Sequence, residues 1–100
     1  MNAPTHDSPL TEQQRYELCL MIGYALADIR LAGQNKKLEQ ARDLADAFHN
    51  FPAALYWKKV AFSWDFLRNE LMNYEEKYPN GPLGQKNHYV AQLEKIKNSQ

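Results

Sequence analysis

Apolar residues recur at alternating steps of three and four along the second half of the chain, as on one face of an α-helix. The series is Trp57, Val60, Trp64, Leu67, Leu71, Tyr74 and Tyr78. Neither Gly nor Pro occurs between residues 53 and 77, so the pattern predicts one helix over residues 52–77, about 39 Å long at ~1.5 Å per residue. We therefore expect an all-helical protein in which this third helix is the dominant element.

The first helix is expected to begin at Thr11, because Thr11 and Gln14 have the spacing of a capping box. It is expected to stop at Gly33, since glycine adopts the left-handed backbone of a helix C-terminus at little cost. Asn35 then offers a cap to a second helix. A fourth helix is expected over residues 86–97, after a turn-rich loop.

Four helices with short connections favour antiparallel neighbours, and the predicted fold is an antiparallel up-down four-helix bundle. One hundred residues is enough for one modest core, so residues 11–97 are expected to form a single domain. Residues 1–10 include two prolines and show no apolar periodicity, and we expect them to be a disordered tail. Residues 98–100 are expected to fray.

Charge and composition limit the possible partners. Twelve basic and twelve acidic side chains cancel, so the chain lacks the positive field that favours phosphate binding, and nucleic acid is not expected as a partner. No apolar run approaches the ~18 residues of a membrane span, and no membrane partner is expected. The polar N-terminus has no signal-like apolar core and Cys19 is the single cysteine, which together favour a cytoplasmic location.

A second apolar stripe lies roughly opposite the first on two of the predicted helices, at about 100° per residue. Its members are Leu55, Phe62 and Phe66 on the third helix and Leu20, Tyr24 and Leu31 on the first. A helix that is apolar on both sides is either sandwiched within its own domain or covered by another chain. Both alternatives stay open. Because a bundle of this size has few helices that could cover two faces, a homodimer or a partner interface at these residues is favoured.

Arg42 and His49 stand seven residues apart on the predicted second helix, so both are expected on one face. This Arg-x6-His spacing resembles the signature of the HEPN ribonucleases, in which the Arg and His of two protomers meet at a dimer interface to cleave RNA. The resemblance implies that His49 is a general acid or base and that Arg42 stabilises the negative charge of the phosphorane. The structural alternative is an Arg42–Asp46 ion pair with a histidine at the helix C-terminus.

Residues 44–52, Leu-Ala-Asp-Ala-Phe-His-Asn-Phe-Pro, resemble a helix-end motif of short bacterial all-helical proteins of unassigned function. The segment is well suited to a corner. Phe48 would enter the core, His49 and Asn50 would bind the freed carbonyl groups, and Pro52 would begin the next helix.

Neither a metal nor a cofactor site is expected. No histidine lies three or four residues from a Glu, a Cys or another His, and the chain has no Gly-rich phosphate loop and no Ser/His/Asp grouping. We therefore expect a small non-enzymatic protein-interaction module that self-associates or binds a protein partner, as immunity and inhibitor proteins do. The alternative is a HEPN-like ribonuclease that uses Arg42 and His49.

Overall fold

The structure is a computed structural model that describes residues 10–56 and 64–99. The helices in these ranges are α1 (Glu12–Gln34), α2 (Leu38–Ala47), α3 (Phe51–Tyr56), α4 (Trp64–Lys77) and α5 (Tyr89–Lys97). The described ranges contain no β-strand and only one isolated bridge, between Asn80 and Lys86. The prediction of an all-helical protein is confirmed. None of the described helices is long and apolar enough to cross a membrane.

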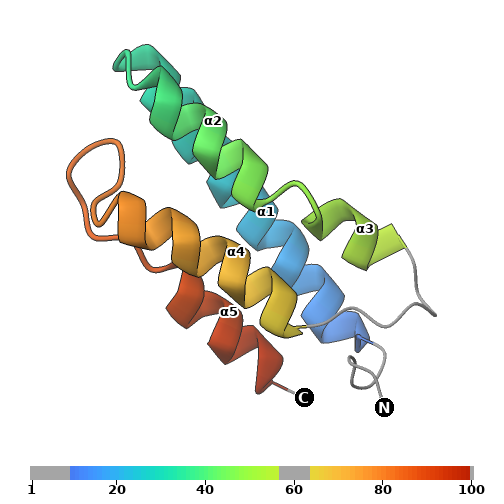
Figure 1. The fold of residues 1–100 in the computed structure, drawn as a ribbon. Helices are drawn as coiled ribbons and strands as arrows, with labels where there is room; N and C mark the ends of the chain where they lie inside the picture. Colours follow the sequence, from blue (N-terminus) through green and yellow to red (C-terminus); the bar gives the residue numbers. More distant parts are fainter. Residues whose placement is uncertain (1–9, 57–63, 100) are drawn as a thin grey trace.

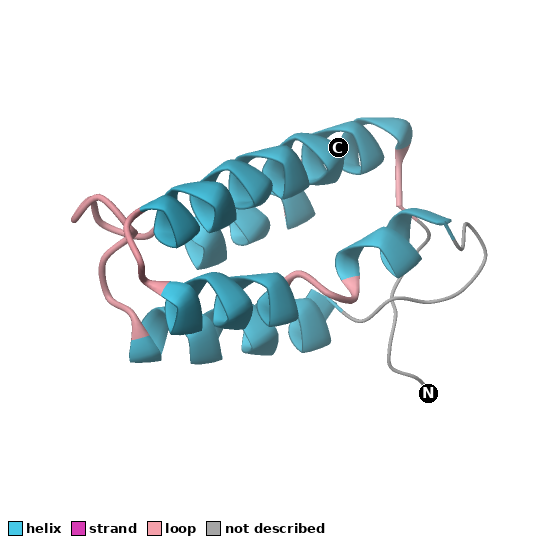
Figure 2. Ribbon diagram, turned by 90° about the horizontal axis from the view of Figure 1, so that it is seen from above, coloured by secondary structure: helices cyan, strands magenta, loops and turns pink. Residues whose placement is uncertain are grey.

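Four of the helices run alongside one another in alternating directions (Figure 1) and lie in two layers when seen from above (Figure 2). α1 packs against α2, α2 against α4, α4 against α5, and α5 against α1, while the short α3 packs on α1. The core lies between the layers. It includes Leu18, Met21, Ala25, Leu44, Phe51, Leu67, Leu71, Leu93 and Ile96.

The predicted capping box at the start of α1 is confirmed. The Gln14 amide donates to the Thr11 hydroxyl at 3.0 Å, and the Thr11 amide donates to the Gln14 side-chain oxygen at 2.9 Å. The Gln14 side chain also donates to the carbonyl oxygens of Ile96, Lys97 and Ser99 at 3.4, 3.2 and 3.2 Å. One buried side chain therefore joins the start of α1 to the end of α5.

The end of α1 lies beyond the glycine that was expected to stop it. The helix passes through Gly33, and Asn35 closes α1 instead of opening α2. Lys36 adopts the left-handed backbone, with φ 63°, and the amides of Lys36 and Lys37 donate to the carbonyl oxygens of Gly33 and Ala32 at 3.1 and 2.8 Å. These bonds offset the ~1–2 kcal/mol that this backbone costs a residue with a side chain.

The predicted dominant helix over residues 52–77 is not seen. α3 and α4 are separate helices, and the longest described helix is α1, with 23 residues. α3 buries Phe51 and Ala54, whereas α4 buries Trp64 and Leu67. On one continuous helix these two faces would point roughly 140° apart, at ~100° per residue. Two separate helices allow both faces to reach the same core.

The apolar spacing did identify the inner face of α4. Its buried residues are Trp64, Leu67, Leu71 and Tyr74. Tyr78, just beyond the helix, is half-buried and packs against the core. The predictions for Trp57, Val60, Phe62 and most of the N-terminal tail lie outside the described residues.

The corner at residues 44–52 is built around an aromatic contact. α2 ends at Ala47, and the buried Phe48 lies 4.4 Å from Phe51 and 5.2 Å from Tyr89, measured between ring centroids. The His49 amide donates to the Asp46 carbonyl at 3.2 Å. Backbone amides therefore make the hydrogen bonds described at this corner, and the expected bonds from the His49 and Asn50 side chains stay a prediction.

α5 begins at Tyr89, three residues later than predicted. The carboxylate of Glu75 accepts the Tyr89 amide at 2.6 Å and the Val90 amide at 3.4 Å, and so acts as a cap supplied by α4. The Tyr89 hydroxyl donates to the carboxylate of Asp28 on α1. Burial, followed by this hydrogen bond, raises the pKa of Tyr89. Tyr89 therefore ties α5 to both neighbouring helices.

Candidate functional site

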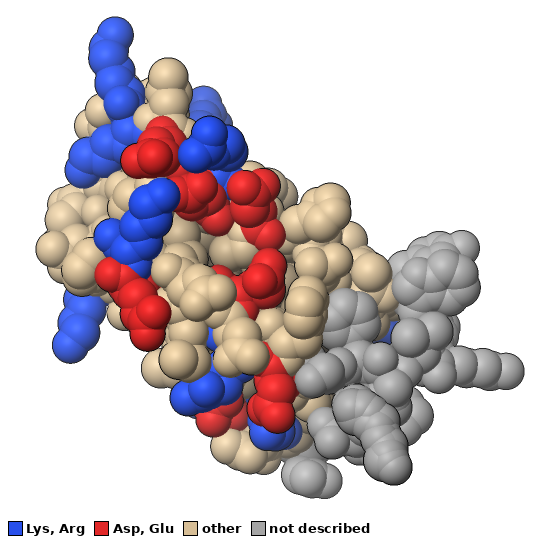
Figure 3. All heavy atoms as spheres, viewed as in Figure 1, with Lys and Arg blue, Asp and Glu red and all other residues tan. Residues whose placement is uncertain are grey.

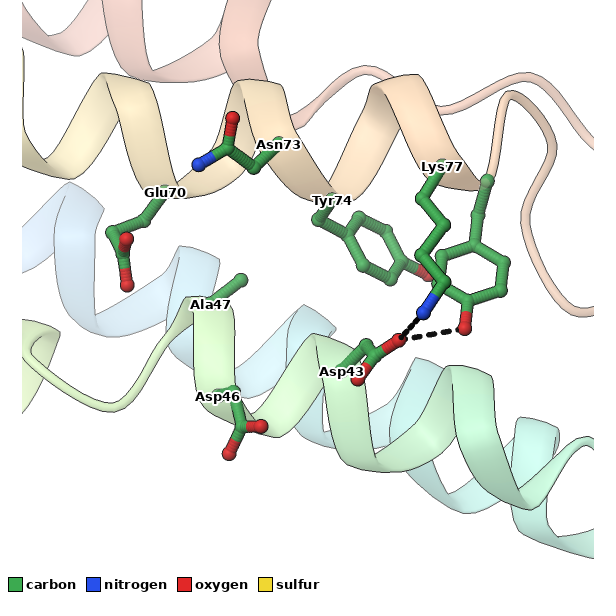
Figure 4. A pocket seen from close by; sticks show the side chains of 8 residues that line it. Asp43, Asp46, Ala47, Glu70, Asn73, Tyr74 and Lys77 are labelled. Carbon is green, nitrogen blue, oxygen red and sulfur yellow. Dashed lines mark hydrogen bonds and ion pairs between the residues drawn. The ribbon is translucent and has the colours of Figure 1, made fainter.

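A groove of about 280 Å³ opens between α2 and α4 (Figure 4). It is lined by Asp43, Asp46, Ala47, Glu70, Asn73, Tyr74, Lys77 and Tyr78. Acidic side chains follow this face of the molecule, where α2 and α4 lie, and appear as red spheres in Figure 3. The groove therefore combines carboxylates, an ammonium group and two phenols within a small volume.

Asp43 is the centre of the interactions in this groove. Its Oδ2 atom accepts a hydrogen bond from Lys77 Nζ at 2.8 Å and another from the Tyr78 hydroxyl at 2.7 Å, as the dashed lines in Figure 4 show. The bond from Lys77, then the one from Tyr78, lowers the pKa of Asp43, and the bond to Asp43 raises the pKa of Lys77. The charge at the centre of the groove is thus neutralised within the chain.

A buried amide lies beneath these charges. Gln40 Nε2 donates to the Tyr74 hydroxyl and to the Asn80 carbonyl oxygen, both at 3.1 Å. Burial raises the pKa of Tyr74 more than the bond from Gln40 lowers it. Lys37 Nζ donates to the Pro82 carbonyl oxygen at 2.8 Å. Together these contacts hold α2 against α4 and against the loop that follows α4.

The structure does not place Arg42 and His49 on one helix. α2 ends at Ala47, so His49 lies in the turn that follows, and a spacing of seven no longer implies a shared face. Arg42 forms ion pairs with Glu39 at 4.0 Å and Asp43 at 3.6 Å instead of the expected pair with Asp46. Across residues 10–56 and 64–99, no three His, Cys, Asp or Glu side chains are grouped as metal ligands.

The exposed surface of α1 differs from the groove because it is uncharged over part of its length. Every exposed residue of this helix from position 16 to position 27 is uncharged. We call these seven residues the outer face of α1: Tyr16, Cys19, Leu20, Gly23, Tyr24, Leu26 and Ala27. Tyr16, Leu20 and Tyr24 follow one another at steps of four and are 61%, 44% and 60% exposed. Gly23 has open space where a side chain would begin.

A hollow of about 230 Å³ borders this face where α1 meets α5. Leu20, Tyr24 and the half-buried Glu17 of α1 line it, together with Gln92, Lys95 and Ile96 of α5. The Gln92 side-chain oxygen is buried and has no hydrogen-bond partner among the described atoms. Two residues of the predicted interface, Leu20 and Tyr24, are therefore brought together at one feature of the surface.

The other predicted interface residues are distributed elsewhere. Leu31 is half-buried, and Leu55 is half-buried on α3, where it packs against the core. Phe66 is 45% exposed, but it lies on α4, which packs against α2 and α5. Phe62 lies outside the described residues. The predicted stripe on the third helix is thus divided, since Leu55 belongs to the inward side of a separate helix.

Sequence reasoning did not include Tyr16 in the candidate interface. The signal was present, because Tyr16 stands one helical turn before Leu20 and so extends the same stripe. Comparisons with known proteins found no matching family, no matching curated protein and no matching solved structure. The chemistry of the two surfaces must therefore indicate the function.

Proposed function

We propose that this protein is a non-enzymatic interaction module that binds a protein partner through the outer face of α1. Its scaffold is an antiparallel up-down bundle formed by α1, α2, α4 and α5, which holds this face rigid. The observation that carries the proposal is that all seven exposed residues of α1 from Tyr16 to Ala27 are uncharged. Contiguous exposed apolar surface of this kind marks interaction sites in soluble proteins.

The side chains on this face suit a protein interface. Tyr16 and Tyr24 each combine an apolar ring with a hydroxyl group that can hydrogen-bond at the edge of a contact, and tyrosine is enriched at interfaces for this reason. Fully burying a leucine side chain such as Leu20 is worth about 1.5–3 kcal/mol, and the part of Leu20 that is still exposed makes some of this available. A partner would therefore gain affinity from surface that the chain itself leaves uncovered.

The groove between α2 and α4 is a less suitable binding surface than the outer face of α1, because charged groups at its centre already have partners. The carboxylate of Asp43 already accepts hydrogen bonds from Lys77 and Tyr78. A ligand that entered there would have to replace these internal bonds, which offsets much of what it could gain. The outer face of α1 requires no such exchange.

Photo-crosslinking in cells that express the protein tests the proposal. A photoreactive amino acid replaces Tyr16, and the matched control places the same group at Ala45, which is exposed on α2. We expect a crosslinked protein product from position 16 and none from position 45, with Leu20→Lys abolishing the product. The proposal is wrong if position 16 gives no product or if both positions give the same product.

A further inference from the structure

We infer that the partner is a second copy of this chain, whose α1 packs antiparallel against the outer face of α1 of the first. This inference rests on the proposed function, because it names the partner of that surface. The seven residues of the face are uncharged, and exposed residues of opposite charge lie beyond its two ends. Glu12 lies at the start of the helix, before the neutral and exposed Gln13, and Arg30 lies near the end of the helix. The face is therefore complementary to itself when one copy is reversed.

An antiparallel pair with its centre at position 21 brings together residues whose numbers add up to 42. Glu12 then meets the partner's Arg30, and by two-fold symmetry Arg30 meets the partner's Glu12. These two residues are 18 positions apart on the helix, so the two ion pairs stand about 27 Å from each other. The uncharged face lies between them, where the helices are in closest contact.

The middle of the face suits close packing. Cys19 is placed opposite the partner's Gly23, and both residues are small and exposed. The site of a Gly23 side chain meets no atom within 4 Å. Because the distance between packed helices depends on the size of the side chains at the contact, small residues at the centre allow the helices to approach. Tyr16 is placed against the partner's Leu26, so larger side chains close the contact on either side.

Charge selects the antiparallel orientation over the parallel one. A parallel pair would place Glu12 against the partner's Glu12 and Arg30 against the partner's Arg30, and like charges in contact repel. Antiparallel packing also places each helix N-terminus beside a C-terminus, which the helix dipoles favour. The whole chain has a formal net charge of zero, so two copies do not repel each other at long range.

The size of the contact sets the expected strength. The surface area that one helix of each protomer can bury is smaller than the ~800 Å² that each partner buries in a standard interface. We therefore expect a reversible dimer with a dissociation constant in the micromolar range.

Charge reversal tests the pairing, with sedimentation equilibrium as the measurement. Glu12→Lys alone and Arg30→Glu alone should each raise the dissociation constant about tenfold at low salt, because each variant turns both ion pairs into repulsions. An equal mixture of the two variants should restore dimerisation, since all charges in the mixed pair are complementary. Circular dichroism on each variant checks that the helices remain folded. The inference is overturned if the wild-type chain dimerises and neither variant alters its dissociation constant.

Disulfide trapping tests the orientation. Gly23→Cys, with Cys19 retained, should give a rapid covalent dimer under mild oxidation, because the antiparallel register places position 23 against the partner's Cys19. Ala45→Cys is the matched control and should not give one at the same rate. Rapid linkage of the wild-type chain through Cys19 alone would show either parallel pairing or an antiparallel pair in another register, and both overturn the inference.

A separate outcome distinguishes this inference from the proposed function. A wild-type mass that stays at 11.7 kDa at every concentration excludes self-pairing. If photo-crosslinking at position 16 then captures a different protein, the interaction module stands and only the second copy is rejected.

Discussion

The groove between α2 and α4 and the outer face of α1 are both open to solvent, but the groove holds charged groups that bond to each other, whereas the outer face is uncharged. In the groove, Asp43 accepts hydrogen bonds from Lys77 and Tyr78, and the buried Gln40 donates to Tyr74 beneath them. On α1, all seven exposed residues from Tyr16 to Ala27 are uncharged. The difference teaches that accessibility alone does not identify an interaction surface. A surface is available to a partner when its polar groups are not already bonded within the chain, or when its apolar side chains are not already buried.

The largest expected effect separates the inner and outer faces of α1. Leu18 is fully buried, whereas Leu20, two residues later, is 44% exposed. Leu18→Ala should lower the free energy of unfolding by about 2–5 kcal/mol through the lost contacts and the cavity it leaves. Leu20→Ala should lower it by less than ~1 kcal/mol in the dilute monomer. Urea denaturation of both variants measures the difference, and equal losses would break the comparison by placing both leucines in the core.

The next effect concerns the buried amide beneath the groove. Gln40→Leu leaves the Tyr74 hydroxyl and the Asn80 carbonyl oxygen without their donor, and should cost about 1–3 kcal/mol. Gln13→Leu is the matched control, because Gln13 is exposed on α1. Thermal unfolding of the two variants measures the cost. If Gln40→Leu proved as stable as the control, the groove would not be held together by its internal polar contacts.

The smallest expected effect is the pH dependence of the Asp43–Lys77 contact. The pKa of Asp43 is lowered from its ordinary value of 3.8, so its contribution is present above that value and is lost as the pH falls through the folded pKa. The pKa of Lys77 is raised from 10.5, so its contribution is present below that value and is lost as the pH rises through the folded pKa. The contact therefore stabilises the fold between these limits.

Asp43→Asn should remove this dependence. The stability difference between wild type and variant should be greatest near neutral pH and should shrink at about pH 3 and about pH 12. Urea titrations at the three pH values, repeated in high salt, measure this difference. Salt should reduce it at neutral pH, because Lys77 is exposed to solvent and Asp43 is partly exposed. A difference that does not change with pH would assign the effect of Asp43 to shape instead of charge.

Local features of the chain were predictable because they depend on neighbours in sequence. The capping box needs only Thr11 and Gln14, and the inner face of α4 follows from the spacing of Trp64, Leu67 and Leu71. Leu20 and Tyr24 of the predicted second stripe are exposed on α1, and whether they form an interface stays a prediction. Each of these features involves residues that lie within one or two helical turns of each other, which is the range over which periodicity carries information.

The remaining features depend on segments that are distant in sequence. Gln14 donates to the carbonyl of Ser99, 85 residues away, and the bonds of Asp43 to Lys77 and Tyr78 span 34 and 35 residues. The division between α3 and α4 likewise arises because two apolar faces must reach one core. Periodicity shows which residues prefer burial, but not which distant segment covers them. The amino-acid pattern thus predicted the all-helical class, the start of α1 and the inner face of α4, but not the bounds of every helix. Only the packing of the helices decided that charged groups of the groove bond to each other and that the outer face of α1 is left exposed.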